Sequence, residues 1–185
     1  MQTFYKQYNG DVFSQNGEDL IIQEVLKRLK KKKGIAVEFG ASDGFYCSNT
    51  ANLKGWTKHL YDINPTGEVE CKNITPDNVN ELPECNLLSI DIDGNDYEVF
   101  KAYKGKPAIV IIEINSSFKP SVDYFSLDQG CSYKTMVELG ISKGYFLLCH
   151  TGNLIFLDEK FKELFPEITG DPLTNVQDYF NYSWI

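Results

Sequence analysis

The sequence predicts an α/β domain built on a mostly parallel sheet. Short apolar segments, each followed by a turn rich in Gly, Asp or Asn, alternate with segments whose apolar residues recur at helical spacing. The most hydrophobic segment, residues 108–114, is almost continuously apolar, as expected for a strand covered by helices on both faces. Two further apolar segments, residues 145–149 and 154–157, flank a short polar turn and predict an antiparallel hairpin at one edge of the sheet.

The first half of the chain supplies a helix and two strands. Residues 18–33 have the apolar spacing of an amphipathic helix, with acids in the first turn and four consecutive lysines at the end. We interpret these lysines as a solvated helix end. Strands are expected at 35–39 and 58–61, joined by a helix that Ser48 or Asn49 would cap and that would end before Gly55.

The second half continues the alternation. A short strand at 69–72 and a helical turn after Pro76 are expected, followed by strands at 87–92 and 108–114 with a helix between them. Residues 115–130 are polar, aromatic and irregular, and we interpret them as a lid or substrate loop. A helix over 133–143 then leads into the hairpin.

Length, charge and composition exclude several classes of protein. The 185 residues suffice for one domain, with an N-terminal helical segment (1–33), a core (34–165) and a C-terminal tail (166–185). A net charge of -8 argues against nucleic acid as a partner. No apolar segment approaches the roughly 20 residues that cross a bilayer, and the first residues do not resemble a secretory signal. The five cysteines are scattered, which argues against disulfides or zinc and favours a cytoplasmic protein.

The turn after the first strand indicates what the sheet binds. Its pattern, Glu38-x-Gly40-x-x-x-Gly44, lacks the second glycine of dinucleotide-binding turns because Ser42 occupies that place. A diphosphate would also meet the negative charge of Glu38. A zwitterionic nucleoside such as S-adenosylmethionine fits better, and Asp62 is placed to bind its ribose. The competing interpretation is that Glu38 and Asp62 are solvated strand ends.

Three carboxylates are candidate catalytic residues. Asp91 and Asp93 lie at the end of one predicted strand and Glu113 ends the next, which directs all three toward the same crevice. Asp91 would act as base toward an acceptor hydroxyl, with Asp93 and Glu113 orienting the substrate. Alternatively, the three acids with Asn115 would hold Mg²⁺. Neighbouring Asn95 and Asp96 have the simpler interpretation of a turn and helix cap.

Other side chains near this crevice have two interpretations each. His150, beside the hairpin turn, is either a base at the mouth of the site or a surface residue. In the predicted lid, the aromatic residues Phe118, Tyr124 and Phe125 would stack on a sugar or close the lid. The two tryptophans, Trp56 and Trp184, are expected to pack structurally.

Several short motifs occur in order between about residues 11 and 157. They are SQNGED (residues 14–19), VEFGASDG (37–44), SNT (48–50), GW (55–56), LSIDIDGNDY (88–97) and IE (112–113). Together they resemble the FkbM-type branch of class I S-adenosylmethionine-dependent methyltransferases. The resemblance implies a Rossmann-like sandwich whose seven-stranded sheet has a reversed last strand, in agreement with the predicted hairpin. It also implies O-methylation, often of sugars in glycans or natural products.

The same resemblance implies residues that contact the cofactor. Glu38, Gly40 and the backbone of Ala41 would face the methionine part, and Asp62 the ribose. Additional contacts are expected from Ser48, Asn49, Gln15 and Asn16.

The function expected from these observations is S-adenosylmethionine-dependent methylation of a hydroxyl on a small molecule or glycan. The alternatives are a non-catalytic nucleoside-binding or regulatory domain and an enzyme that cleaves S-adenosylmethionine. No nucleic acid or membrane partner is expected. The aromatic tail over residues 171–185 is expected to pack either on the core of its own chain or on a second subunit of a homodimer.

Overall fold

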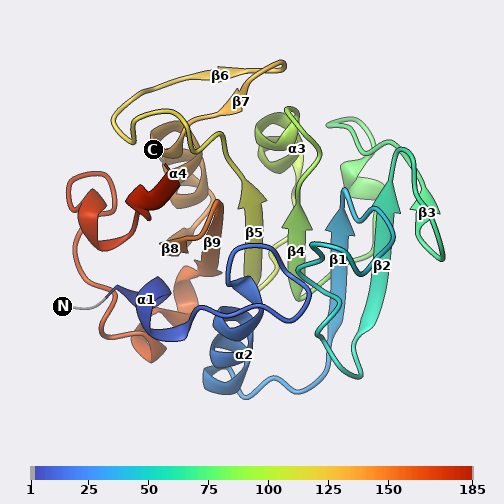
Figure 1. The fold of residues 1–185 in the computed structure, drawn as a ribbon, viewed down its shortest axis with the longest axis horizontal. Coiled ribbons are helices and arrows are strands. Elements are labelled where there is room, and N and C mark those ends of the chain that lie inside the picture. The colour runs from blue at the N-terminus through green and yellow to red at the C-terminus, as the bar shows by residue number, and fades with distance from the viewer. Residues whose placement is uncertain (1–2, 185) are drawn as a thin grey trace.

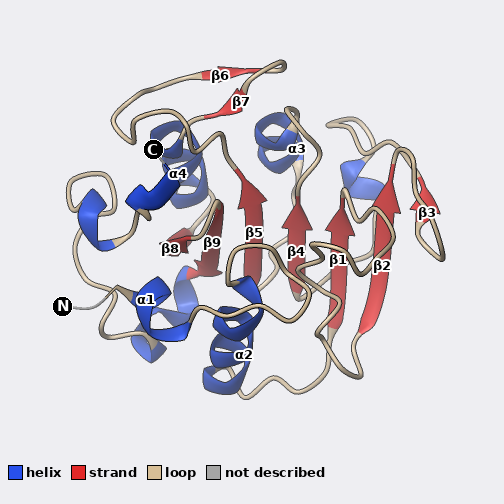
Figure 2. Ribbon diagram, viewed as in Figure 1, coloured by secondary structure: helices blue, strands red, loops and turns tan. Residues whose placement is uncertain are grey.

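The computed structural model describes residues 3–184 and has a central sheet of seven strands (Figures 1 and 2). The strand order is β3-β2-β1-β4-β5-β9-β8, and all strands run parallel except β9, which is antiparallel to both of its neighbours. The predicted α/β class, the mostly parallel sheet and the hairpin are confirmed. The strands are β1 (Ile35–Phe39), β2 (Thr57–Asp62), β3 (Glu70–Cys71), β4 (Leu87–Ile90), β5 (Ile109–Glu113), β8 (Tyr145–His150) and β9 (Asn153–Asp158).

Helices cover both faces of this sheet. Phe100 of α3 packs on Phe156 of β9, with ring centroids 6.4 Å apart. On the other face Phe146 of β8 contacts Phe165, which in turn contacts Phe4 of α1. Phe156 pairs across the ladder with the residue after Phe146, so the two rings must point to opposite faces. The α-helices are α1 (Phe4–Tyr8), α2 (Glu18–Arg28), α3 (Asp96–Ala102) and α4 (Tyr133–Ser142).

The prediction of a helix between the first two strands is wrong. Residues 48–54 form turns instead, because their side chains bond to Glu38 and so compete with helical hydrogen bonding. The hydroxyl groups of Ser48 and Thr50 both donate to the Glu38 carboxylate, 2.7 and 2.5 Å away. The connection from β1 to β2 is therefore built around a buried acid.

Two other boundaries differ from expectation. Helix α2 ends at Arg28 instead of Lys33, because Lys30 adopts a left-handed conformation with φ of 52° and turns the chain out of the helix. The segment 115–130, expected to be irregular, contains part of a small hairpin formed by β6 (Phe125–Ser126) and β7 (Gly130–Cys131). Both differences arise from local turn geometry that apolar periodicity does not report.

The C-terminal tail packs on the core of its own chain. Tyr179 and Phe180 are buried, and short 3-10 helices at Glu159–Leu164, Val176–Asp178 and Tyr182–Trp184 lead the chain across the sheet edge. Another 3-10 helix, Val79–Glu81, precedes β4 at the predicted helical turn. All five cysteines are free thiols. Between residues 3 and 184 no helix has the length and apolar character needed to cross a membrane.

The single arginine, Arg28, links the first two helices to this tail through ion pairs and ring contacts. The guanidinium of Arg28 forms ion pairs with Glu24 at 2.9 Å and Glu167 at 2.6 Å. It also lies over the rings of Phe4 and Phe165, 5.3 and 4.9 Å from their centroids. Such a planar, delocalised cation can pair with carboxylates and stack on rings at the same time.

Candidate functional site

Two clefts meet above the carboxyl ends of the parallel strands. Strand β1 lies between β2 and β4, so strand order reverses there, and open α/β sheets bind ligands at such a point. The β1 cleft, of about 460 Å³, is lined by residues that follow β1, β2 and β4. The β5 cleft, of about 550 Å³, lies beyond β4 and β5. Asp91 and Asp93 line both clefts.

Glu38 forms the buried wall of the β1 cleft. Besides the two hydroxyl groups, its carboxylate accepts the backbone N–H of Asn49 at 2.8 Å. Burial raises the pKa of Glu38, although these hydrogen bonds and the charge of Lys58 oppose the shift. Glu38 therefore organises the turn that follows β1. Ser48 lies behind it and, unlike Glu38 and Asn49, does not line the cleft.

Asn49 carries an unsatisfied polar atom in this wall. Its amide nitrogen donates to the hydroxyl of Ser89 at 3.1 Å, but its buried Oδ1 has no hydrogen-bond partner. The side chain lines the β1 cleft. Because buried acceptors without partners are rare and destabilising, this oxygen indicates a place for a donor group of a ligand.

Asp62 and Gly40 shape the mouth of the β1 cleft. Asp62 is half-buried, and its carboxylate accepts the N–H groups of Ser42 and Asn64, both at 2.8 Å. A Cβ added to Gly40 would lie 1.6 Å from the carbonyl oxygen of Asp91, so the turns after β1 and β4 touch there. Ala41, by contrast, is buried and does not line the cleft; its N–H donates to the carbonyl of Tyr61.

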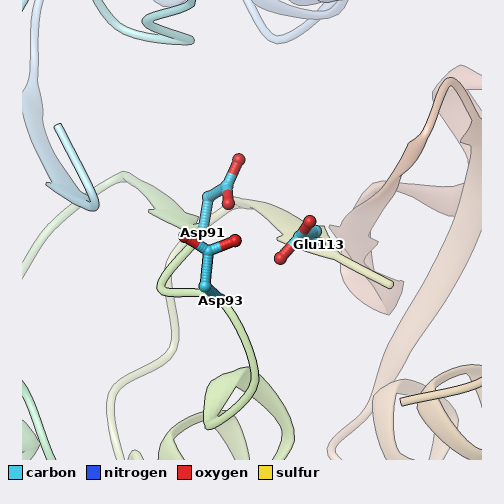
Figure 3. Close-up of side chains that lie close together, drawn as sticks. All are labelled: Asp91, Asp93 and Glu113. Carbon is cyan, nitrogen blue, oxygen red and sulfur yellow. The ribbon is translucent and has the colours of Figure 1, made fainter. Parts of the chain in front are cut away.

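The three predicted catalytic carboxylates come together in the β5 cleft. One oxygen from each of Asp91, Asp93 and Glu113 lies within 4.8 Å of the others (Figure 3). Burial raises the pKa of Asp91 to about 7, and the charges of Asp96 and Asp93 add to the shift. Burial and the charge of Asp91 raise the pKa of Glu113 to about 8. The Asp91–Glu113 pair therefore retains a proton near neutral pH.

The loop after β4 is held in shape by Asp96. The carboxylate of this buried residue accepts the N–H groups of Ile92 at 2.9 Å and Gly94 at 3.0 Å, which supports its interpretation as a turn residue. Asn95 is the residue before α3, and its side chain does not cap the helix. Asp93 adopts a left-handed conformation with φ of 56° and is exposed at the junction of the clefts.

Asn115, the expected fourth ligand of a metal ion, is bound within its own loop. Its Oδ1 accepts the N–H and hydroxyl of Ser117 at 3.1 and 2.5 Å, and its amide nitrogen donates to the Gln129 carbonyl at 2.9 Å. The three carboxylates alone could hold a divalent cation through oxygen. Asn115 would have to give up these bonds to join them.

Gln15 and Asn16 line the β5 cleft and not the β1 cleft. Glu18 determines this placement: its carboxylate accepts the N–H of Asn16 at 2.8 Å and the hydroxyl of Thr151 at 2.6 Å. Thr151 belongs to the turn between β8 and β9, so the N-terminal loop is joined to the hairpin. The structure therefore places these two amides in the β5 cleft, away from Asp62, and not with the other residues expected to contact the cofactor.

His150 is buried and structural, so neither sequence interpretation is correct. Its Nδ1 accepts the N–H of Asn181 at 3.2 Å, which assigns the ring hydrogen to Nε2, and Nε2 lies 2.8 Å from the Ser116 hydroxyl. The ring stacks on Phe180 with centroids 4.2 Å apart. Burial lowers the pKa of His150 to about 3, so the imidazole is neutral at physiological pH.

The hairpin formed by β6 and β7 borders the β5 cleft. Asp128 and Gln129 at its tip line the cleft, and a Cβ on Gly94 would lie 2.3 Å from the carbonyl oxygen of Leu127. The aromatic residues of this segment do not line the cleft. Phe118 packs against Tyr124 with centroids 4.9 Å apart, and Phe125 packs against Tyr97 at 4.8 Å.

Trp184 is a site residue that the sequence did not predict. It lines the β5 cleft while its indole N–H donates to the Thr151 carbonyl at 2.8 Å. An isolated tryptophan in a tail carries no motif, and nothing in the sequence pairs it with Thr151. The placement depends on how the tail crosses the sheet edge.

In comparisons with known proteins, the chain matches no protein-family model, no curated protein and no solved structure. The function must therefore be inferred from the two clefts and the sequence motifs.

Proposed function

We propose that the protein is an S-adenosylmethionine-dependent O-methyltransferase that binds its cofactor in the β1 cleft and a hydroxyl acceptor in the β5 cleft. The observation that carries this proposal is that both clefts share Asp91 and Asp93. Groups bound in the two clefts would meet at these residues. The sheet order, with a reversed last strand, agrees with what the resemblance to FkbM-type enzymes implies for a Rossmann-like sandwich.

The residues of the β1 cleft fit this cofactor. The free Oδ1 of Asn49 can accept a hydrogen bond from an amine, and Asp62 can accept from ribose hydroxyl groups. Four carboxylates line the cleft and Lys72 is the one cation among its described lining residues, so a sulfonium is favoured over a diphosphate. The lining acids are Glu38, Asp62, Asp91 and Asp93. When bound, the cofactor supplies an electrophilic methyl group.

The chain's own contribution to the reaction is a base and an oriented site. With a pKa of about 7, Asp91 is available as a carboxylate near neutral pH and can take the proton of an acceptor hydroxyl. Glu113 keeps the pair's proton and donates it toward Asp91, which holds that carboxylate in place. Asp93 orients the acceptor, which would bind beside the β6–β7 hairpin that borders the cleft. The competing role for the three acids is to hold Mg²⁺.

The lining of the β5 cleft supports a hydroxyl-rich acceptor. Side-chain amides both donate and accept hydrogen bonds, as sugar hydroxyl groups require. The indole of Trp184 offers a flat apolar surface beside them. No lysine, arginine or histidine is among the described residues that line this cleft, so an anionic acceptor would be repelled. The lining amides are Gln15, Asn16, Asn115, Gln129 and Asn153.

Calorimetry with S-adenosylmethionine and its demethylated product tests cofactor binding, and a labelled methyl group with candidate glycans tests transfer. The Asp91→Asn variant should still bind the cofactor, with a modest loss of affinity because Asp91 also lines the β1 cleft, and should lose transfer by about a hundredfold or more. Asp178→Asn, the same change at an exposed position outside both clefts, is the control and should leave both unchanged.

The other outcomes separate the alternatives. Binding without transfer would identify a nucleoside-binding domain, and breakdown of the cofactor without acceptor would identify a cleaving enzyme. Transfer that needs added Mg²⁺, with Mg²⁺ binding lost in Asp91→Asn, would assign the carboxylates to the metal. If the protein does not bind S-adenosylmethionine, the proposal is wrong.

A further inference from the structure

A separate groove of about 670 Å³ lies at the opposite end of the sheet. We call it the basic groove: its walls are Lys27, Lys30, Lys31 and Lys32 at the end of α2, and Lys54 in the turns before β2. In Figure 1 this end of α2 lies at the bottom of the view, whereas β1, β2, β4 and β5 point their carboxyl ends upward. The basic groove is thus remote from the two clefts.

The floor of the basic groove is apolar. Leu26 and Leu53 are buried beneath it, and the half-buried indole of Trp56 forms one side. A volume of this size is typical of small-molecule pockets. The four lysines at the end of α2 alone would indicate only a solvated helix end. The structure adds a fifth lysine and an aromatic wall from a separate segment, which together enclose a concave site.

Four of the five lysine charges in the basic groove are not neutralised by the protein. No carboxylate is among its described lining residues, which contain only lysines and neutral side chains. Lys27 pairs with Glu24 at 2.9 Å, but the other four lysines make no hydrogen bond or ion pair through their side chains with any described residue. The four unpaired ammonium groups around one hollow repel one another, on a chain whose net charge is -8. A multivalent anion would relieve that repulsion.

Lys30 occupies a backbone position that favours glycine. The N–H groups of Lys30 and Lys31 donate to the carbonyls of Lys27 and Leu26, which is the Schellman arrangement at a helix end. Lys30 takes the left-handed conformation of this arrangement, with φ of 52°. A side chain here strains the backbone. The strained position places one more cation on the groove wall.

We propose that the basic groove binds a soluble small ligand that carries several phosphate groups. Lysine is a strong phosphate binder that acts as a point charge, and five lysines around an apolar floor fit an organic molecule with clustered phosphates. The surface has no arginine, and its one indole is half-buried, so it lacks the row of stacking rings that single-stranded nucleic acids require. A concave hollow also suits a small solute better than a flat bilayer.

The test is calorimetric titration of the whole protein with inorganic tripolyphosphate at low and moderate salt. We expect saturable binding that weakens as salt is added. The triple variant Lys30→Gln/Lys31→Gln/Lys32→Gln should weaken binding by about tenfold or more. The matched control, Lys6→Gln/Lys104→Gln/Lys119→Gln, removes the same charge outside the basic groove and should bind like the wild type.

Two further binding measurements distinguish a soluble phosphate ligand from other anions and from a membrane surface. Polyglutamate offers the same charge without phosphate and should bind more weakly than tripolyphosphate. Vesicles of phosphatidylcholine with a minority of phosphatidic acid should not sediment the protein. The proposal is overturned if the two triple variants lose the same affinity for tripolyphosphate, or if polyglutamate binds as tightly as tripolyphosphate. It is also overturned if the protein binds vesicles but not tripolyphosphate. Lys30→Gly, which relieves the backbone strain while removing one charge, should raise the melting temperature yet weaken tripolyphosphate binding.

Discussion

Replacement of Glu113 by glutamine should change how stability depends on pH. The pKa of this carboxyl is raised from 4.5 to about 8 by burial and by Asp91. At a pH below its ordinary pKa, a carboxyl is protonated in both the folded and the unfolded chain. A raised pKa in the folded state then has no effect on the free energy of unfolding. Above the ordinary pKa, the unfolded chain loses its proton while the folded chain keeps it, so stability falls as pH rises from 4.5 toward 8.

The magnitude follows from the shift. At 1.36 kcal/mol for each pKa unit, the full shift would correspond to about 5 kcal/mol above pH 8. Glu113 is partly exposed and shares its proton with Asp91, so solvent screening reduces the expected value to about 2 kcal/mol. Glu113→Gln keeps the shape and the hydrogen-bond donor but cannot ionise. It should therefore be more stable than the wild type by about this amount at high pH.

Urea unfolding of both proteins at about pH 4.5 and about pH 9 measures the difference. The gap in free energy of unfolding should be close to zero at the lower pH and about 2 kcal/mol at the higher. Glu68→Gln, at an exposed position outside both clefts, controls for the loss of one negative charge. If the free energies of unfolding of wild type and Glu113→Gln differ by the same amount at both pH values, the shared proton is refuted. The assignment of Asp91 as a base near neutral pH is then refuted with it.

Three further substitutions test packing and backbone geometry, one beside the β5 cleft and two elsewhere in the fold. Gly94→Ala would place a Cβ 2.3 Å from the Leu127 carbonyl, so it should destabilise the protein by about 1–3 kcal/mol and speed hydrogen exchange in the β6–β7 hairpin. Arg28→Lys keeps the charge but loses the planar contacts with rings and with Glu167, and chemical unfolding should show a loss of about 1–3 kcal/mol. Lys30→Gly should stabilise the protein by about 1 kcal/mol in the same assay, because glycine adopts the φ of 52° without strain.

Much of the sheet could be predicted because most of its strands, β1, β4, β5, β8 and β9, are short and largely apolar runs bounded by turns. The same patterns located the carboxylates: Asp91 and Glu113 end apolar runs, so they were expected at the sheet edge, and they lie together there. The helix after β1 was predicted wrongly because Ser48 and Thr50 bond to Glu38, an interaction between segments that a helical pattern does not contain.

The remaining parts of the site depend on contacts between distant segments. His150 is covered by Phe180 and Asn181 of the tail, which no local pattern connects to the hairpin turn. The cleft that Gln15 and Asn16 line is determined by Glu18 bonding across to Thr151. Sequence periodicity indicates which residues are buried, but it does not indicate which distant segment buries them.

The chain contains two tryptophans, and they lie at opposite ends of the sheet, Trp184 beside the β5 cleft and Trp56 in the basic groove. Each indole is thus an intrinsic fluorescent reporter for one region only. Variants that keep a single tryptophan would let emission from Trp184 follow occupancy of the β5 cleft, while emission from Trp56 follows the basic groove. Simultaneous titration of both sites would then reveal directly whether they communicate, without any attached dye.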